Sequence, residues 1–364
     1  MILPDDFVSI EPVDLRDISR NAGIMVDEVS PFANRRELVI SGDQLILDRH
    51  YGLAYHAMEL RPSAIWGRTA DLPPYSGDHL ANRGFLRVPF RRIPRRLVRS
   101  RRDIEGLVAT IRSADPNLRM LFRGQTTEHF IQRSPETTRW LFGEDAVMEP
   151  SLTTSASRRR PALDHVISEW CALLNVFLVK ACGMGGQQDY ENLAGGCGFP
   201  LFSLALAQHY GLPTSGLDVT DRLDVALFFA LMKFHKPAGG HRATYSRLTE
   251  FESLPAVYLL FPQQEQQFEY ERYRTETFPR GRPDAQSARF MHMGWGHSDN
   301  ACAERIFLAL YLDPEGDYGP IPSSGQLFPK GADDPFGHFL EHIDTGSFPE
   351  ALKQVLEENF YSVA

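Results

Sequence analysis

The segment 204–234, LALAQHYGLPTSGLDVTDRLDVALFFALMKF, constrains the fold more than any other part of the chain. Two apolar runs of helical length flank a short segment that has the character of a strand. The first run ends at Gly211 with Pro213 just beyond it, which is a common way for a helix to end. The segment therefore predicts a helix, a strand and a second helix in close succession.

Polar residues occupy the breaks between these apolar runs. Thr220 or Asp221 can cap the second helix, because short hydroxyl and carboxylate side chains accept hydrogen bonds from the first helical turn. Helix punctuation does not explain Gln208, His209 and Asp218, so we interpret these three residues as contacts to a small ligand. The alternatives are a structural role for His209 alone, or an imidazole–carboxylate pair of His209 and Asp218 in a hydrolase.

Apolar periodicity predicts further elements on both sides of this segment. Because strands and helices alternate irregularly along the chain, they favour an α+β fold over a doubly wound α/β fold. The predicted helices span 101–116 and 161–183 and lie near 348–359, and the predicted strands span 118–125, 256–261, 287–296 and 305–313.

An Arg-rich stretch sets the first domain boundary. Residues 83–102 contain nine arginines and no acid, and together with their prolines they predict a solvated linker. The other interpretation is a patch at Arg91–Arg102 for nucleic acid or another anionic partner, because guanidinium groups bind phosphate through paired hydrogen bonds. We therefore predict an N-terminal appendage over 1–100 that ends in this linker, a main domain over 101–315, and a C-terminal tail with a terminal helix over 316–364.

Composition argues against several classes of protein. The net charge of −9 does not suit a protein built mainly to hold nucleic acid, and the lack of any run of 18 apolar residues argues against a membrane span. The first residues lack the basic and apolar regions of a secretory signal, so we expect a cytoplasmic protein. The four cysteines show no CxxC spacing, which predicts reduced, structural thiols and no metal cofactor.

Several short motifs occur in a fixed order along the central region. They are FRGQ at 122–125, PSL at 150–152, LAQHYGLPT at 206–214, LDVT at 217–220 and VALFFAL at 225–231. Together they resemble the signature of the FRG-domain family, which is named for its Phe-Arg-Gly motif. The resemblance covers about residues 103–312. It assigns a family and leaves the activity open.

A second resemblance concerns chemistry. LFRGQ (121–125) and DVTDRLDVALFFA (218–230) are similar to the first two elements of ADP-ribosyltransferases of the Arg–Ser–Glu class. This similarity implies a split mixed or antiparallel sheet flanked by helices, with NAD as the substrate. Thr153-Thr154-Ser155 is a rival for the second element by its letters, but it lacks the helix spacing. The predicted third strand, 287–296, carries neither Glu nor Asp, so the catalytic acid of that class has no candidate there.

The two resemblances imply roles for individual residues. An arginine at the end of a strand can clamp phosphate oxygens, and short polar side chains on a neighbouring strand can hold ribose hydroxyls. The implied catalytic residues are Arg123, His209 and Asp218, and the implied nucleotide contacts are Arg123, Gln125, Gln208, Tyr210, Thr220 and Arg289.

The function that these roles predict is an ADP-ribosyltransferase-like enzyme or an NAD glycohydrolase. Such an enzyme cleaves the nicotinamide–ribose bond of NAD, and a bacterial effector or defence protein would fit this activity. The alternative is a non-catalytic module that senses or binds a nucleotide or a nucleic acid.

Overall fold

The computed structural model describes most of the chain between residues 84 and 363, together with short strands before it. The described residues are 38–41, 45–48, 50–51, 53–56, 61–63, 84–88, 91–142, 145–159, 163–183, 199–238, 240–262, 267–269, 280–292, 300–344, 346 and 350–363. None of the helices within these ranges combines the length and the apolar character that a membrane crossing requires.

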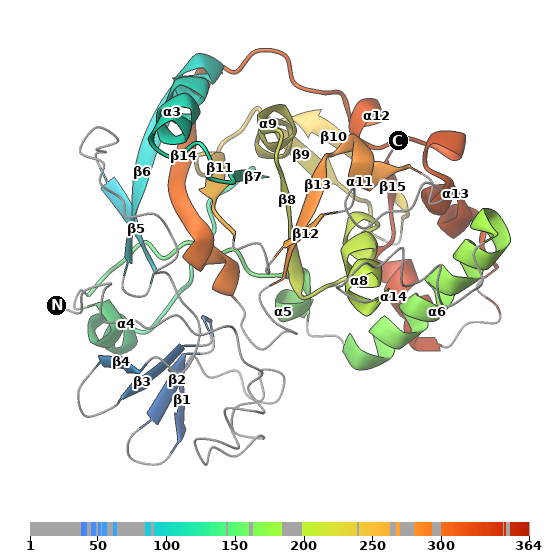
Figure 1. Ribbon diagram of the computed structural model, residues 1–364, viewed down its shortest axis with the longest axis horizontal. Coiled ribbons are helices and arrows are strands. Elements are labelled where there is room, and N and C mark those ends of the chain that lie inside the picture. The colour runs from blue at the N-terminus through green and yellow to red at the C-terminus, as the bar shows by residue number, and fades with distance from the viewer. Residues whose placement is uncertain are drawn as a thin grey trace.

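A sheet of eight strands runs through the middle of the molecule (Figure 1). Its strands, in spatial order, are β12 (Gln267–Glu269), β13 (Ala288–His292), β8 (Gly216–Thr220), β7 (Leu121–Gln125), β11 (Ala256–Leu260), β14 (Ile306–Asp317), β6 (Arg91–Ser100) and β5 (Gly84–Val88). Neighbours are antiparallel except β14 and β6, which are parallel. The fold is therefore α+β with a mixed sheet, as predicted.

The sheet is weakest between β7 and β8. Each of these strands has an extensive ladder with its other neighbour, β11 for β7 and β13 for β8. Between β7 and β8, the described residues pair at one point, Phe122 with Thr220. The sheet thus consists of two well-paired halves that are joined over a very short contact.

Two helices cover one face of the sheet. They are α3 (Arg101–Ala114) and α9 (Leu223–Leu231), both near the top of Figure 1. The helix α3 begins at Ser100, whose hydroxyl accepts a hydrogen bond from the backbone N–H of Asp103. Its apolar residues recur at helical spacing, so Ile104 and Leu107 pack in one core with Ala226 and Ala230 of α9.

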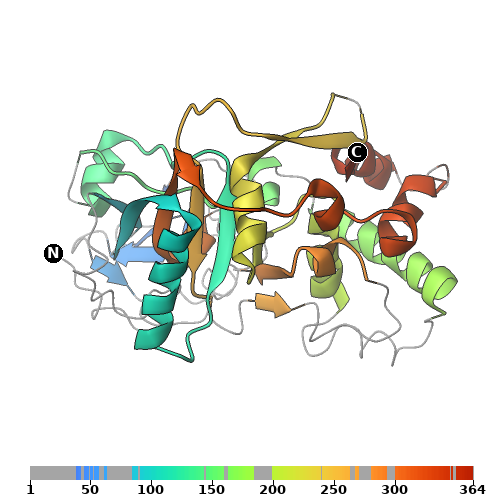
Figure 2. The same ribbon diagram turned by 90° about the horizontal axis from the view of Figure 1, so that it is seen from above.

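The predicted C-terminal tail is part of the core. The helices α13 (Pro335–His342) and α14 (Glu350–Asn359) pack with α6 (Leu163–Cys182) and α8 (Phe199–His209), as Figure 2 also shows. Phe336 and Leu352 are buried there beside Phe177 of α6. The tail looked separate in the sequence because its helices are short and are divided by Gly and Pro.

The predicted Arg-rich linker is also part of the fold. It forms β5 and β6, and its apolar residues Ile93 and Val98 are buried while Arg92 and Arg99 are exposed. Ile93 and Val98 belong to two different core clusters, so β6 contributes apolar side chains to both faces of the sheet despite its arginines. The linker prediction was wrong because it weighed the arginines and prolines and overlooked the apolar residues between them.

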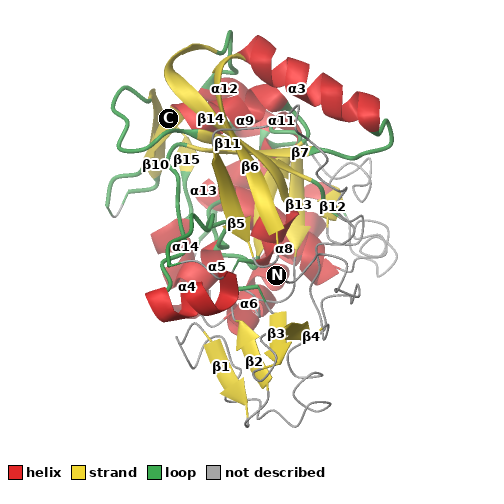
Figure 3. Ribbon diagram, turned by 90° about the vertical axis from the view of Figure 1, so that its left-hand side faces the viewer, coloured by secondary structure: helices red, strands yellow, loops and turns green. Residues whose placement is uncertain are grey.

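The remaining elements surround this framework. The strands β1 (Leu38–Ser41), β2 (Leu45–Asp48), β3 (Leu53–His56) and β4 (Arg61–Ser63) form an antiparallel sheet at one end of the molecule (Figure 3). A third sheet has the order β15 (Ser362–Val363), β10 (Arg242–Arg247), β9 (Met232–His235). The other short helices are α4 (Pro135–Phe142), α5 (Ser155–Arg159), α11 (Arg282–Ala285), η5 (Ala301–Arg305), α12 (Ser324–Leu327) and η6 (Gly331–Asp333).

Candidate functional site

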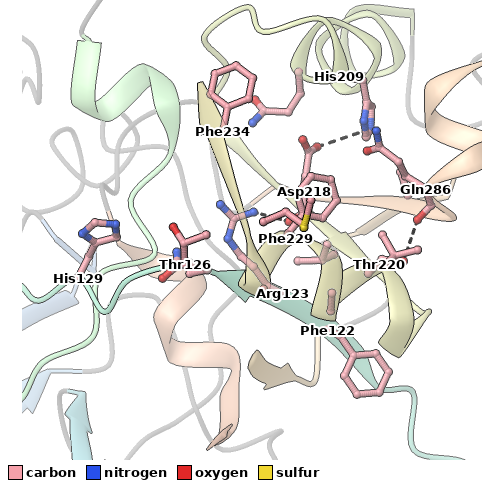
Figure 4. A pocket seen from close by; sticks show the side chains of 18 of the residues that line it. Phe122, Arg123, Thr126, His129, His209, Asp218, Thr220, Phe229, Phe234 and Gln286 are labelled. Atoms are coloured by element: carbon pink, nitrogen blue, oxygen red, sulfur yellow. Dashed lines mark hydrogen bonds and ion pairs between the residues drawn. The ribbon is translucent and has the colours of Figure 1, made fainter. Parts of the chain in front are cut away.

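A cavity of about 850 Å³ is lined by residues from both sides of the weak β7–β8 contact (Figure 4). The strand β7 contributes Arg123 and Gln125, β8 contributes Asp218 and Thr220, and α9 contributes Phe229. Ligand sites in proteins commonly have volumes of about 300–1,000 Å³. The short strand pairing therefore coincides with a cavity large enough for a small molecule.

Gly124 sets the distance between β7 and the helix above it. A Cβ atom at this position would lie 1.9 Å from the carbonyl oxygen of Ala226 in α9. Any larger residue would push the helix away from the strand, because two backbones cannot share this space. The glycine of the Phe-Arg-Gly motif thus allows the close approach that forms this wall of the cavity.

Arg123 connects the two strands where their backbone pairing stops. Its Nη1 donates a hydrogen bond of 2.5 Å to the carbonyl oxygen of Asp218, while its buried Nε has no hydrogen-bond partner. Burial lowers the pKa of the guanidinium, and the nearby charge of Asp218 opposes this shift. The side chain stays charged, since arginine does not lose its proton in proteins.

Asp218 places a carboxylate in the cavity wall. Its side chain keeps 31% of its exposure, whereas that of His209 keeps 1%, and Asp218 Oδ1 lies 3.6 Å from His209 Nε2. Burial raises the pKa of Asp218, against the opposing effects of His209, Arg123 and a hydrogen bond from Gln208. The structure therefore brings together the three predicted catalytic residues, Arg123, His209 and Asp218 (Figure 4).

Hydrogen bonds from Thr214 of the QHYGLPT motif and from Ser155 hold Gln208 in place. Its Oε1 accepts hydrogen bonds from the hydroxyls of Thr214 and Ser155. Gly211 lies between Gln208 and Thr214 with φ of +91°, a left-handed conformation that glycine adopts without strain. Because the amide oxygen accepts from these hydroxyls, the NH₂ group points the other way and donates a hydrogen bond to the carboxylate of Asp218.

The other predicted contacts on this side have mixed outcomes. Thr220 lines the cavity, but its hydroxyl donates to the carbonyl of Gln286 at 2.9 Å and accepts from the N–H of Arg222 at 3.1 Å. Arg222 is the N-cap residue of α9 and makes no side-chain capping bond, so neither Thr220 nor Asp221 is the cap that the sequence predicted. Gln125 lines the cavity with a buried Oε1 that has no hydrogen-bond partner.

Two predicted nucleotide contacts lie elsewhere. The hydroxyl of Tyr210 donates to Asp334 at 2.6 Å, and its ring packs in the core against Phe336. Arg289 is buried on β13 and donates to Asp221 at 2.8 Å. Neither side chain is among those that line the cavity, so Tyr210 and Arg289 have structural partners in place of the predicted ligand.

The cavity is also lined by residues outside the predicted set of contacts, among them Thr153 of the rival segment Thr153-Thr154-Ser155. One end carries His129, Arg158, Ser151 and Thr153, and the helix α9 and the β9–β10 pair contribute three aromatic side chains, Phe229, Phe234 and Tyr245. Burial lowers the pKa of His129, and the positive charges of Arg158 and Arg123 add to this effect. Arg158 follows the PSL motif closely in the sequence, whereas His129 is carried by no motif.

The strand β13 has no acid that reaches the site. Its residues are Ala288–His292, and Arg289 on this strand pairs with Asp221 outside the cavity. Gln286, just before the strand, lines the cavity and donates through Nε2 to the carbonyl of Leu327 at 3.1 Å. Within the described residues, Asp218 is therefore the carboxylate of the cavity.

The comparisons with known proteins give one match. Residues 119–238 match the family model of the FRG domain. No curated protein and no solved structure matches the chain. The matched segment contains β7, β8 and α9, and with them Arg123, Gly124, His209 and Asp218. Residues 119–238, which supply β7, β8 and the helix α9 over them, are therefore the part of the chain that is similar to the FRG domain.

Proposed function

We propose that this cavity binds NAD and cleaves its nicotinamide–ribose bond. The observation that carries the proposal is the carboxylate of Asp218 in the cavity wall, with His209 behind it and a pKa raised by burial. A carboxylate with a perturbed pKa in a cleft marks a candidate functional site, because burying an incompletely satisfied charge opposes folding.

The two ends of the cavity fit the two kinds of group in a dinucleotide. Arg158 and His129 at one end provide donors for pyrophosphate oxygens, and Arg123 adds positive charge beside them. The ring centroids of Phe234 and Tyr245 lie 5.3 Å apart, and the two rings form an apolar surface on which a base can stack.

Asp218 has the role of stabilising charge in the reaction. When the bond between the ribose anomeric carbon and the nicotinamide nitrogen breaks, its electron pair moves to the nicotinamide ring and positive charge develops on the ribose. A carboxylate beside that carbon stabilises the charge. In hydrolysis, water then forms the new carbon–oxygen bond and gives its proton to His209 or Asp218, which leaves ADP-ribose.

The test incubates the purified 364-residue chain with NAD and measures the release of nicotinamide by chromatography. We expect release in the wild type and a loss of at least about 100-fold in Asp218→Asn, because the amide cannot stabilise positive charge. The control is Asp145→Asn, since Asp145 is an exposed partner of Arg139 outside the cavity. This variant keeps the wild-type rate.

Absence of release, with or without a protein or nucleic-acid acceptor, contradicts the catalytic proposal. Calorimetric titration with NAD then separates the alternatives. If the wild type binds NAD and Asp218→Asn does not, the protein is a nucleotide-binding module without catalysis. If the wild type does not bind NAD, NAD is excluded as the ligand of this cavity.

The predicted nucleic-acid partner at Arg91–Arg102 has less support from the structure. Arg95 pairs with Glu128 at 3.1 Å, Arg99 with Asp313 at 3.1 Å, and Arg101 with Glu105 at 2.8 Å. Glu128 and Asp313 come from distant parts of the sequence, and Glu105 lies one helical turn after Arg101. All three reduce the positive charge that is available to phosphate. Binding of nucleic acid at this stretch stays a prediction.

A further inference from the structure

The helix α13 carries three potential metal ligands on one exposed face. They are His338, Glu341 and His342, and one ligand atom from each lies within 4.8 Å of the others. Residues three and four positions apart lie on the same side of a helix, so this spacing is suited to binding one ion. Within the described part of the chain, this is the one group of three such side chains.

The hydrogen bond of His342 leaves a nitrogen ready for a metal. Its Nδ1 lies 2.8 Å from the carbonyl oxygen of His338. Because a carbonyl can only accept a hydrogen bond, Nδ1 must carry the proton, and in the neutral ring the lone pair is then on Nε2. Metal-binding histidines in proteins usually have this arrangement, in which one nitrogen donates to a carbonyl and the other binds the ion.

The position of the cluster in the helix favours a cation. The helix α13 ends at His342, and the C-terminus of a helix carries partial negative charge from its unpaired carbonyl groups. Glu341 adds a full negative charge. The inner face of the same helix is fixed in the core by Phe336 and Leu340, so the backbone that carries the ligands is held in place.

One feature opposes binding of a cation. Glu341 and His342 also line a second cavity, of about 740 Å³, together with Arg242 and Lys330. All three potential ligands are exposed, so water and salt screen the repulsion from these charges. Direct coordination by imidazole and carboxylate acts over a much shorter range and is not weakened in this way.

We propose that His338, Glu341 and His342 bind a divalent transition-metal ion on the surface of α13. Two imidazoles and one carboxylate suit Zn²⁺, and three protein ligands leave a fourth tetrahedral position open. The site is separate from the cavity between β7 and β8, because none of its three residues lines that cavity.

Titration of the metal-free, full-length chain with Zn²⁺ tests this site. The purification tag is removed first, and binding is measured by isothermal titration calorimetry. We expect one ion per chain, with the affinity reduced at least about tenfold in His342→Ala and in Glu341→Gln. His235→Ala is the matched control, since His235 is an exposed histidine on β9 that interacts with Ser246 of the neighbouring strand β10. It keeps the wild-type affinity.

Co²⁺ provides a second readout, since its visible absorption reports the coordination directly. A tetrahedral spectrum in the wild type that is absent in His342→Ala supports the site. The proposal is overturned if the wild type binds no Zn²⁺, or if His342→Ala binds it as the wild type does while retaining the circular dichroism of the folded chain.

Discussion

Two polar clusters of this protein each contain an aspartate, and they differ in how completely the carboxylate is paired with other side chains. In the first, Asp334 accepts hydrogen bonds from Tyr210 at 2.6 Å and from Arg282 at 3.1 Å, and both ionic side chains are at most 3% exposed. In the second, Asp218 keeps 31% of its exposure and lies 3.6 Å from His209. In the first cluster these side chains satisfy one another, and their contacts connect the residue just after α8 to α11 and to the start of α13. The second leaves part of a carboxylate open to a cavity, where a ligand can complete its contacts.

The largest expected effect is on the closed cluster. Replacing Asp334 by Ala leaves the buried charge of Arg282 without its carboxylate partner, so we expect the free energy of unfolding to fall by about 3–5 kcal/mol. Urea unfolding of Asp334→Ala measures this. The control is Asp344→Ala, because Asp344 is exposed and accepts one hydrogen bond from Gly346. If the free energy of unfolding falls by less than about 1 kcal/mol in Asp334→Ala, the closed cluster does not stabilise the fold as proposed.

The wall of the open cluster depends on Gly124. In Gly124→Ala the new methyl group meets the carbonyl of Ala226, so strand and helix must separate, and we expect a loss of about 3 kcal/mol. Gly106→Ala is a suitable comparison, since Gly106 lies inside α3 with nothing within 4 Å of an added Cβ. That change favours helix formation by about 0.5–1 kcal/mol. Equal melting temperatures for the two variants would contradict the role given to Gly124.

The open cluster itself is expected to tolerate neutralisation. Asp218→Asn keeps the shape of the side chain and removes a charge that burial disfavours, so the free energy of unfolding changes by less than about 1 kcal/mol. The same urea experiment measures it beside Asp334→Ala. If the free energy of unfolding falls as much in Asp218→Asn as in Asp334→Ala, the carboxylate of Asp218 is as important for stability as that of Asp334, and the contrast between the two clusters is contradicted.

The smallest effect is the pH dependence that Asp218 contributes to stability. Its pKa is raised above the ordinary value of 3.8, so the folded state holds this proton more tightly than the unfolded state. Stability therefore falls as the pH rises from the unfolded pKa through the folded pKa, and the penalty stays constant above that range. The difference between Asp218→Asn and the wild type should grow in favour of the variant over the same range. A difference that is independent of pH would show that the pKa of Asp218 is not shifted.

Local sequence patterns were sufficient for the elements that form the cavity. The apolar run before Gly211, the strand around Asp218 and the following helix occur where their residues predict them. Gln208, His209 and Asp218 stood out because helix punctuation left them unexplained, and the structure brings all three to the cavity. Each of these inferences needed residues that are close together in the sequence.

The predictions that the structure corrects depend on contacts between residues that are distant in the sequence. Tyr210 has the same local setting as His209, and only the position of Asp334, far along the chain, shows that it points into the core. The burial of β6 depends on β14. His129 reaches the cavity from a loop without a motif. The spacing of His338, Glu341 and His342 is visible in the sequence, whereas the expectation of no metal rested on the cysteines.

The single pairing of Phe122 with Thr220 has a mechanical consequence for the whole sheet. An ordinary ladder of five residues would have to break several backbone hydrogen bonds before its strands could move apart. Among the described residues, backbone pairing between the two halves of the sheet is limited to one residue pair, and the side chain of Arg123 adds a hydrogen bond across them. Widening the floor of the cavity for an entering molecule therefore requires the loss of one residue pair and the rotation of one side chain, while the ladders on either side remain intact.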